Sequence, residues 1–144
     1  QDRISVSCWV KSTATSGQII STGSRNSYRI GKTENGVDCG LYLSDATDGY
    51  GIGASAVVDC SDWTHVVIVY NGSEVKLYIN GQLKSSDTGA GSVFCNQTVY
   101  LNFGTYQWGS SCSDWYKGYL DDVRLYNRAI TSEEVNALYH EGGW

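Results

Sequence analysis

The sequence contains no methionine, few basic residues and no long apolar run. Ten Lys and Arg residues stand against fifteen Asp and Glu, which gives a net charge of −5 and a pI of about 4.8. No Lys/Arg cluster in the sequence reverses this negative field locally, so nucleic acids and anionic lipid surfaces are poor partners. The longest apolar runs, such as residues 66–70, are far shorter than the roughly 20 residues that a membrane-spanning helix needs, so we expect no membrane insertion.

Because methionine is absent and the chain opens at Gln1, we expect either a processed product, which a removed signal peptide would explain, or a piece of a longer chain. Five cysteines and two glycosylation sequons, at Asn71 and Asn96, also favour secretion. The sequence therefore predicts a secreted, extracellular glycoprotein.

The motifs of catalysis and of zinc binding are also missing. Glycoside hydrolysis needs two carboxylates about 5 to 9 Å apart across the scissile bond, and no run of acidic residues at alternate positions occurs. Asp121 and Asp122 are adjacent, which places them on opposite faces of a strand. His65 and His140 have no recognisable partner motif, and no Cys-x-x-Cys or His-x-x-x-His pair is present. We expect that the protein is not an enzyme.

What the chain does contain is a series of short strand-forming segments separated by Gly, Asn, Asp and Ser, which is typical of an all-β sandwich or barrel. A length of 144 residues fits one domain, residues 1–144. We predict strands at 4–10, 41–43, 52–58, 63–70, 75–79, 99–103 and 119–126, and one at Tyr28. Trp9 and Trp63 lie in patterned strands and are assigned to the core. Thr131 and Glu134 form a capping box, which predicts one short C-terminal helix.

Three stretches resemble the concanavalin A-like lectin/glucanase domains of laminin G-like type. They are residues 4–11, residues 63–67 with 77–81, and residues 118–130. The resemblance implies two antiparallel sheets in a jelly-roll sandwich, and binding of glycans, proteoglycans or proteins, often with calcium nearby. It makes Asp121 the candidate calcium ligand, although Asp121 accepting backbone hydrogen bonds at a sheet edge is an equal alternative. One departure is that the family usually has another strand ahead of residue 4.

Carbohydrate binding needs a planar aromatic side chain against the sugar ring and polar groups that exchange hydrogen bonds with its hydroxyls. The predicted loop from Tyr106 to Trp115 offers both. Trp108 is the expected stacking residue, with anchoring of the loop as the alternative. The predicted carbohydrate-binding residues are Asn26, Asp48, Tyr106, Trp108, Asp114 and Trp115. The main hypothesis is a non-catalytic lectin for a small glycan; an adhesion or protein-interaction module is the alternative, and a glycoside hydrolase fragment ranks third.

The cysteines and the bare sheet edge give two further predictions. Cys39 and Cys60 fall symmetrically about the turn at residues 49–50, so a hairpin would place them opposite each other in a disulfide. Cys95 and Cys112 flank the same strand and loop and form the second predicted pair, which leaves Cys8 as a free, buried thiol. Without a preceding strand, the strand at 4–10 would expose an edge, and we predict a homodimer through it; a tail ending at Trp144 could cover it instead.

Overall fold

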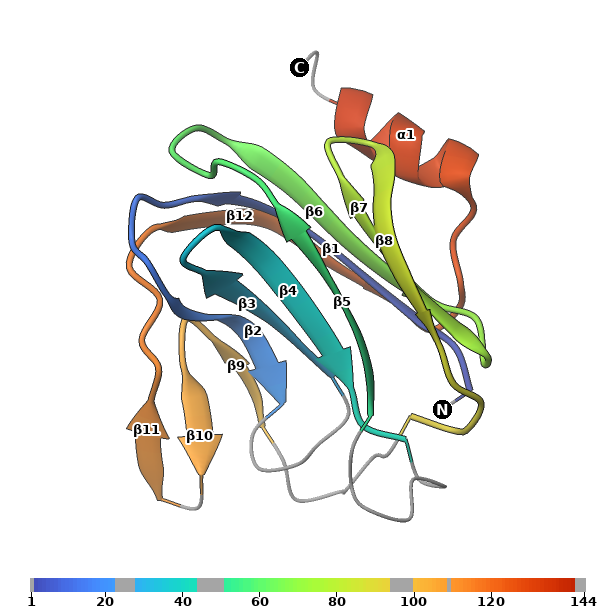
Figure 1. The fold of residues 1–144 in the computed structure, drawn as a ribbon, viewed down its shortest axis with the longest axis horizontal. Coiled ribbons are helices and arrows are strands. Elements are labelled where there is room, and N and C mark those ends of the chain that lie inside the picture. The colour runs from blue at the N-terminus through green and yellow to red at the C-terminus, as the bar shows by residue number, and fades with distance from the viewer. Residues whose placement is uncertain (1, 23–27, 44–50, 94–99, 109, 142–144) are drawn as a thin grey trace.

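Two five-stranded antiparallel sheets face each other in the computed structural model, which describes residues 2–22, 28–43, 51–93, 100–108 and 110–141 (Figure 1). The back sheet has the order β12-β1-β6-β7-β8, with β12 Tyr119–Tyr126, β1 Ile4–Lys11, β6 Thr64–Tyr70, β7 Glu74–Ile79 and β8 Gln82–Thr88. The front sheet has the order β5-β4-β3-β2-β9, with β5 Ile52–Val57, β4 Gly36–Leu41, β3 Tyr28–Thr33, β2 Gly17–Thr22 and β9 Leu101–Phe103. This arrangement confirms the predicted jelly-roll sandwich.

The strand β1 is covered on both of its faces. Ile4, Val6, Cys8 and Val10 point into the core between the sheets, as the alternation predicts. On the other face, the Trp9 indole stacks on Tyr139 of the helix α1 (Ser132–His140), with ring centroids 5.8 Å apart. Trp9 is therefore buried, as predicted.

The helix α1 begins where the capping box predicts. Thr131 is the N-cap; its hydroxyl accepts a hydrogen bond from the Glu134 amide, and the Glu134 carboxylate accepts one from the Thr131 amide. Ile130 and Val135 are both buried in a second apolar cluster between the helix and the back sheet. At nine residues, α1 is too short to cross a membrane, and no other described helix is long and apolar enough to do so.

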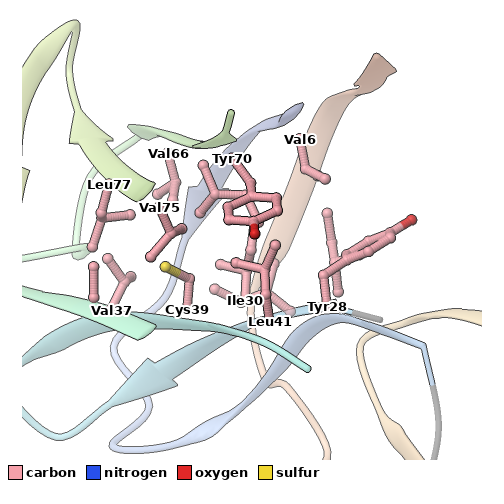
Figure 2. Close-up of a cluster of buried hydrophobic side chains, with 14 of the residues drawn as sticks. Val6, Tyr28, Ile30, Val37, Cys39, Leu41, Val66, Tyr70, Val75 and Leu77 are labelled. Atoms are coloured by element: carbon pink, nitrogen blue, oxygen red, sulfur yellow. The ribbon is translucent and has the colours of Figure 1, made fainter. Parts of the chain in front are cut away.

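The Cys39–Cys60 disulfide is not formed. Leu41 pairs with Ile52 and Cys39 with Ala54, so the β4–β5 hairpin is centred three residues earlier than the predicted turn, and Cys60 lies beyond the end of β5. Cys39 instead points between the sheets near Val37 and Val75 (Figure 2). Cys8, Cys39 and Cys60 are all free and buried, which confirms the prediction for Cys8. Cys112 is an exposed free thiol, and its predicted partner Cys95 lies outside the described residues.

The strand β1 is not a sheet edge, which corrects the basis of the predicted dimer. It lies between β12 and β6 and pairs with both. The strand β12, which comes near the end of the sequence, pairs with the side of β1 that was expected to be bare. The edge of the back sheet on this side is therefore β12, and Leu125, which pairs with the inward-facing Val6, is 43% exposed there.

Two local predictions also need correction. The segment 106–115 is not a loop, because β10 (Tyr106–Trp108) pairs with β11 (Ser111–Ser113) in a small hairpin. Trp63 precedes β6 and is half-buried rather than in the core; its indole lies 6.3 Å from the Tyr119 ring. A strand at β2 was missed, since Gly17 and Gln18 weaken its apolar pattern.

Candidate functional site

The outward face of the front sheet carries a polar cluster on a floor of glycines. Ile30, Cys39 and Ala54 are cross-strand neighbours that point into the core. Because side chains alternate along a strand, the residues on either side of them point outward. On β3 and β4 these outward positions hold Arg29 and Gly31, and Asp38 and Gly40.

Arg29 and Asp38 form a two-pronged ion pair on this face. Arg29 Nη1 donates to Asp38 Oδ1 at 3.0 Å, and Nη2 donates to Oδ2 at 2.6 Å. The side chains are 32% and 24% exposed, so the pair is partly sheltered from water. Burial alone would lower the pKa of Arg29, but the hydrogen bonds and charge of Asp38 outweigh it and the net shift is upward.

The glycines make this pair possible. Arg29 is the cross-strand neighbour of Gly40, and Asp38 is the neighbour of Gly31, so the two charged side chains meet on the diagonal. A Cβ on Gly31 would lie 2.6 Å from Asp38 Oδ1 and 3.1 Å from Arg29 Nη1. A larger residue at position 31 would therefore displace the ion pair.

Gln18 adds a polar group beside the pair. A Cβ on Gly31 would stand 3.5 Å from Gln18 Nε2, which places the amide next to the same glycine. Gln18 Oε1 is buried and has no hydrogen-bond partner among the described residues. A buried acceptor without a donor costs free energy, so this oxygen marks a polar position that the described residues leave unsatisfied.

Trp115 lies directly beside Gln18. The two residues form a parallel β-bridge, and the backbone N–H of Gln18 donates to the backbone carbonyl of Asp114 at 2.8 Å. Trp115 is 60% exposed, so its indole offers an apolar surface at the border of the polar cluster. Two of the predicted carbohydrate-binding residues, Asp114 and Trp115, are thus brought to the edge of the front sheet.

The β10–β11 hairpin, which carries the predicted residues Tyr106 and Trp108, is tied to β2. The Ser21 hydroxyl donates to the Thr105 carbonyl at 2.7 Å, and the Gly104 amide donates to the Ile19 carbonyl at 2.9 Å. Tyr106 is half-buried on β10. Trp108 ends β10, but its side chain lies outside the described part, as do Asn26 and Asp48. Whether these residues join the site stays a prediction.

Asp121, the candidate calcium ligand, lies on β12, the edge strand of the back sheet. Calcium takes about six to eight oxygen ligands. Asp121 is exposed on β12, and its Oδ1 accepts a hydrogen bond from the Asp122 amide at 2.8 Å. Within the described ranges, no three His, Cys, Asp or Glu side chains gather where they could hold a metal ion. Asp121 thus accepts a backbone hydrogen bond, as the alternative expected, and its role as a calcium ligand stays a prediction.

The sequon at Asn71 lies on an exposed turn between β6 and β7. Asn71 Oδ1 accepts hydrogen bonds from the Ser73 and Glu74 amides, at 3.0 and 2.9 Å. The side-chain amide nitrogen, to which a glycan would be attached, is therefore held on the surface. The second sequon, at Asn96, lies outside the described residues.

Sequence reasoning missed Gln18, Arg29 and Asp38. A signal was available, because each charged residue is followed two positions later by a glycine, Arg29 by Gly31 and Asp38 by Gly40. On a strand this spacing places charge and glycine on one face. Only the register of β3 against β4 shows that Arg29 and Asp38 lie next to each other.

Two facing antiparallel sheets with a polar outward face and an aromatic border define a β-sandwich of the lectin type. The sequence profile Laminin_G_3, described as the concanavalin A-like lectin/glucanases superfamily, matches residues 1–136, and the chain belongs to this family. No curated protein matches the chain.

Several solved structures share the fold. The carbohydrate-binding module CBM40 of the Ruminococcus gnavus IT-sialidase, solved with α2,3-sialyllactose, has a TM-score of 0.80 at 16% identity, covering 96% of this chain and 83% of that chain. A heptameric SAP-like pentraxin from Limulus polyphemus has a TM-score of 0.75 at 18% identity, covering 99% and 71%. The ligand-binding domain of botulinum neurotoxin serotype D, in complex with N-acetylneuraminic acid, has a TM-score of 0.73 at 19% identity. The match covers 99% of this chain and 37% of that chain. This chain thus spans little more than a third of the neurotoxin domain.

Proposed function

We propose that the protein is a non-catalytic carbohydrate-binding module, and that it holds a small glycan against the outward face of the front sheet beside Trp115. The observation that carries the proposal is the cluster of Arg29, Asp38 and Gln18 on glycine-floored strands, bordered by an exposed indole. The family and the sialic acid-bearing structures with the same fold support a glycan as the ligand.

The polar cluster supplies both kinds of hydrogen-bonding group that sugar hydroxyls need. The Arg29 guanidinium has N–H groups left over after it donates two hydrogen bonds to Asp38, and each Asp38 oxygen has a further lone pair. The Gln18 side-chain amide lies beside the pair and adds to the polar character of this surface. Because Arg29 and Asp38 neutralise each other, this cluster suits a pair of neighbouring hydroxyls better than a charged group.

Trp115 supplies the apolar part of the site. Because positions 31 and 40 carry no side chains, the Arg29–Asp38 pair lies close against the strands, and a sugar ring can lie over the pair. An exposed indole can lie against the C–H face of the ring, which is how aromatic side chains contribute apolar contact together with orientation. The two parts together would fix both the position and the orientation of one sugar residue.

A glycan array with the intact protein tests the proposal. Trp115→Ala should weaken binding by about 1 to 2 kcal/mol, because an aromatic anchor is lost. Asp38→Asn should weaken binding too, since the amide cannot accept both hydrogen bonds from Arg29. Leu83→Ala, which removes a 52% exposed side chain from β8 in the back sheet, is the matched control and should bind like the unmodified protein.

Two outcomes would contradict the proposal. If no glycan binds, the protein is better explained as an adhesion or protein-interaction module. If binding survives both Trp115→Ala and Asp38→Asn, the glycan binds elsewhere. Repeating the array with a chelator tests whether glycan binding needs calcium.

We also propose that the protein is extracellular and carries a glycan at Asn71, since the sequon lies on an exposed turn. Enzymatic removal of N-linked glycans from the protein secreted by eukaryotic cells should lower its mass, and Asn71→Gln should remove that part of the shift.

A further inference from the structure

A hollow of about 480 Å³ lies where β1 ends and β12 begins, and it shares no residue with the proposed glycan site. Its lining includes Lys11, Thr13, Ser61, Lys117 and Tyr119. Lys11 and Lys117 are far apart in the sequence, so the basic character of this hollow arises only from the fold.

The walls of the hollow are braced by hydrogen bonds that belong to the protein itself. The Ser12 hydroxyl donates to the Lys117 carbonyl at 2.5 Å, and the Ser12 amide donates to the Cys60 carbonyl at 2.7 Å. The Tyr116 hydroxyl lies 3.2 Å from the carbonyl oxygens of both Lys11 and Tyr119. These contacts fix the backbone on both sides, so a ligand would meet a preformed site.

The hollow is locally basic in a chain of net charge −5. Lys11 Nζ lies 3.1 Å from Asp62 Oδ1, but the Asp62 side chain is 88% exposed, and exposed pairs of this kind contribute little. Lys117 is exposed and has no ion pair within the described part of the chain. An adjoining hollow, which shares Ser12 and Thr13, contains a third lysine, Lys32, together with Glu34 and Asp59.

An aromatic surface faces the same hollow. Tyr119 is 68% exposed, and its ring lies 6.3 Å from the Trp63 indole at an angle of 56°. This tilted contact supports the Tyr119 ring, while most of the side chain stays exposed to solvent. The hydroxyls of Thr13 and Ser61 add donors and acceptors next to it.

We propose that this hollow is a second binding site, which takes an anionic saccharide residue. The carboxylate of the sugar would bind between the ammonium groups of Lys11 and Lys117, and the sugar ring would lie against Tyr119. Charge-assisted hydrogen bonds give the preference for the acidic sugar, and the aromatic contact gives the preference for a sugar over a simple anion.

Titration of the intact, isotope-labelled protein with D-glucuronate, D-glucose and acetate, followed by NMR, tests the proposal. Glucuronate should shift the amide signals of residues 11–13 and 117–119, and glucose and acetate should bind at least about tenfold more weakly, the effect of losing one charge-assisted hydrogen bond or one aromatic contact. Raising the salt concentration should weaken glucuronate binding.

Variants separate this site from the proposed glycan site. Lys117→Gln and Tyr119→Ala should each raise the Kd for glucuronate, while Lys84→Gln, which removes an exposed lysine from β8, should leave it unchanged. Amide spectra of each variant report whether it is folded. Equal binding of glucose or of acetate, or binding unaffected by Lys117→Gln, would overturn the proposal. Glucuronate binding that is lost in Asp38→Asn but kept in Lys117→Gln would assign it to the first site instead, whereas failure of the glycan array leaves this second site unaffected.

Discussion

Acidification should destabilise this protein through His65, because the folded chain buries this imidazole in its neutral form. His65 lies on β6 and faces α1; it is 1% exposed, with its ring centroid 5.0 Å from Trp9 and 6.1 Å from Tyr139. Its Nε2 lies 2.9 Å from the Ser7 hydroxyl, and its Nδ1 is buried without a partner among the described residues. A proton on Nδ1 would have no acceptor.

The size of this loss of stability follows from the difference between the pKa of His65 in the folded and in the unfolded chain. Burial lowers the pKa of His65 from 6.5 to about 4; the charge of Asp122 opposes this shift and that of Arg124 adds to it. Since the folded pKa is below the unfolded one, the unfolded chain takes up the proton first as the pH falls. Stability is unaffected above pH 6.5 and is lost progressively between pH 6.5 and 4. Between pH 7 and pH 5, this linkage removes about 2 kcal/mol from the free energy of unfolding.

Urea denaturation at pH 7 and at pH 5 measures this loss. His65→Phe should abolish most of the pH dependence, whatever its effect on stability at pH 7, and Ser7→Ala combined with His65→Phe removes the hydroxyl that the single variant leaves unpaired. His140→Asn, at an exposed histidine of α1, is the control and should keep the slope. An unmodified protein with the same stability at both pH values, or a His65→Phe variant with an unchanged slope, would refute the reasoning.

Two further predictions concern the thiols and the sheet edge. Burial raises the pKa of Cys8 to about 12 and that of Cys39 to about 11, so neither should react with iodoacetamide in the folded protein. After unfolding without reductant, Cys8, Cys39 and Cys60 should all be alkylated, and a peptide linking Cys39 to Cys60 would contradict the structure. The homodimer stays an untested prediction, because its original basis, a bare edge at β1, does not hold. Sedimentation at micromolar concentration decides it: a monomer at every concentration rules it out, and if a dimer forms, Leu125→Lys at the edge of β12 should weaken it only if that edge is the interface.

The strands that could be predicted are those whose pattern is local. The apolar run of β6 requires cover on both faces, and Asn80-Gly81 after β7 adopts positive φ angles of 49° and 77°, as a tight hairpin turn needs. The capping box at Thr131 is likewise readable over four residues. In each of these cases neighbours in the sequence are also neighbours in space.

The register of β4 and β5 could not be read in the same way. The Cys39–Cys60 pairing assumed a tight turn centred on residues 49 and 50, but the pairing of Leu41 with Ile52 leaves a longer connection between the strands. What fixes the register is burial, because Cys39 and Ala54 must both face the core. Because a free cysteine is also apolar enough to be buried, the sequence alone cannot show whether Cys39 packs in the core or forms a disulfide.

The candidate sites depend on contacts that no local pattern shows. Gln18 meets Trp115, and Lys11 meets Lys117, only because residues 114–119 pass from the front sheet to the back sheet. Aromatic and acidic composition pointed to the segment ending at Trp115, whose role in binding stays a prediction, but composition could not show which strand this segment would join. The missing information was the pairing partner, which is a property of the whole sandwich.

The crossing segment also links the two sites physically. Gly17 has a φ of 148°, and a Cβ there would lie 2.6 Å from the Cα of Tyr116, so only glycine lets β2 approach this segment closely. Tyr116 in turn holds the carbonyls of Lys11 and Tyr119. A side chain at position 17 would therefore disturb both sites at once, because it would push Trp115 away from Gln18 and shift Tyr116, which braces the wall of the basic hollow. Changes at Asp38 or Lys117, by contrast, alter one site and leave the crossing intact, which is why they are the variants that can tell the two sites apart.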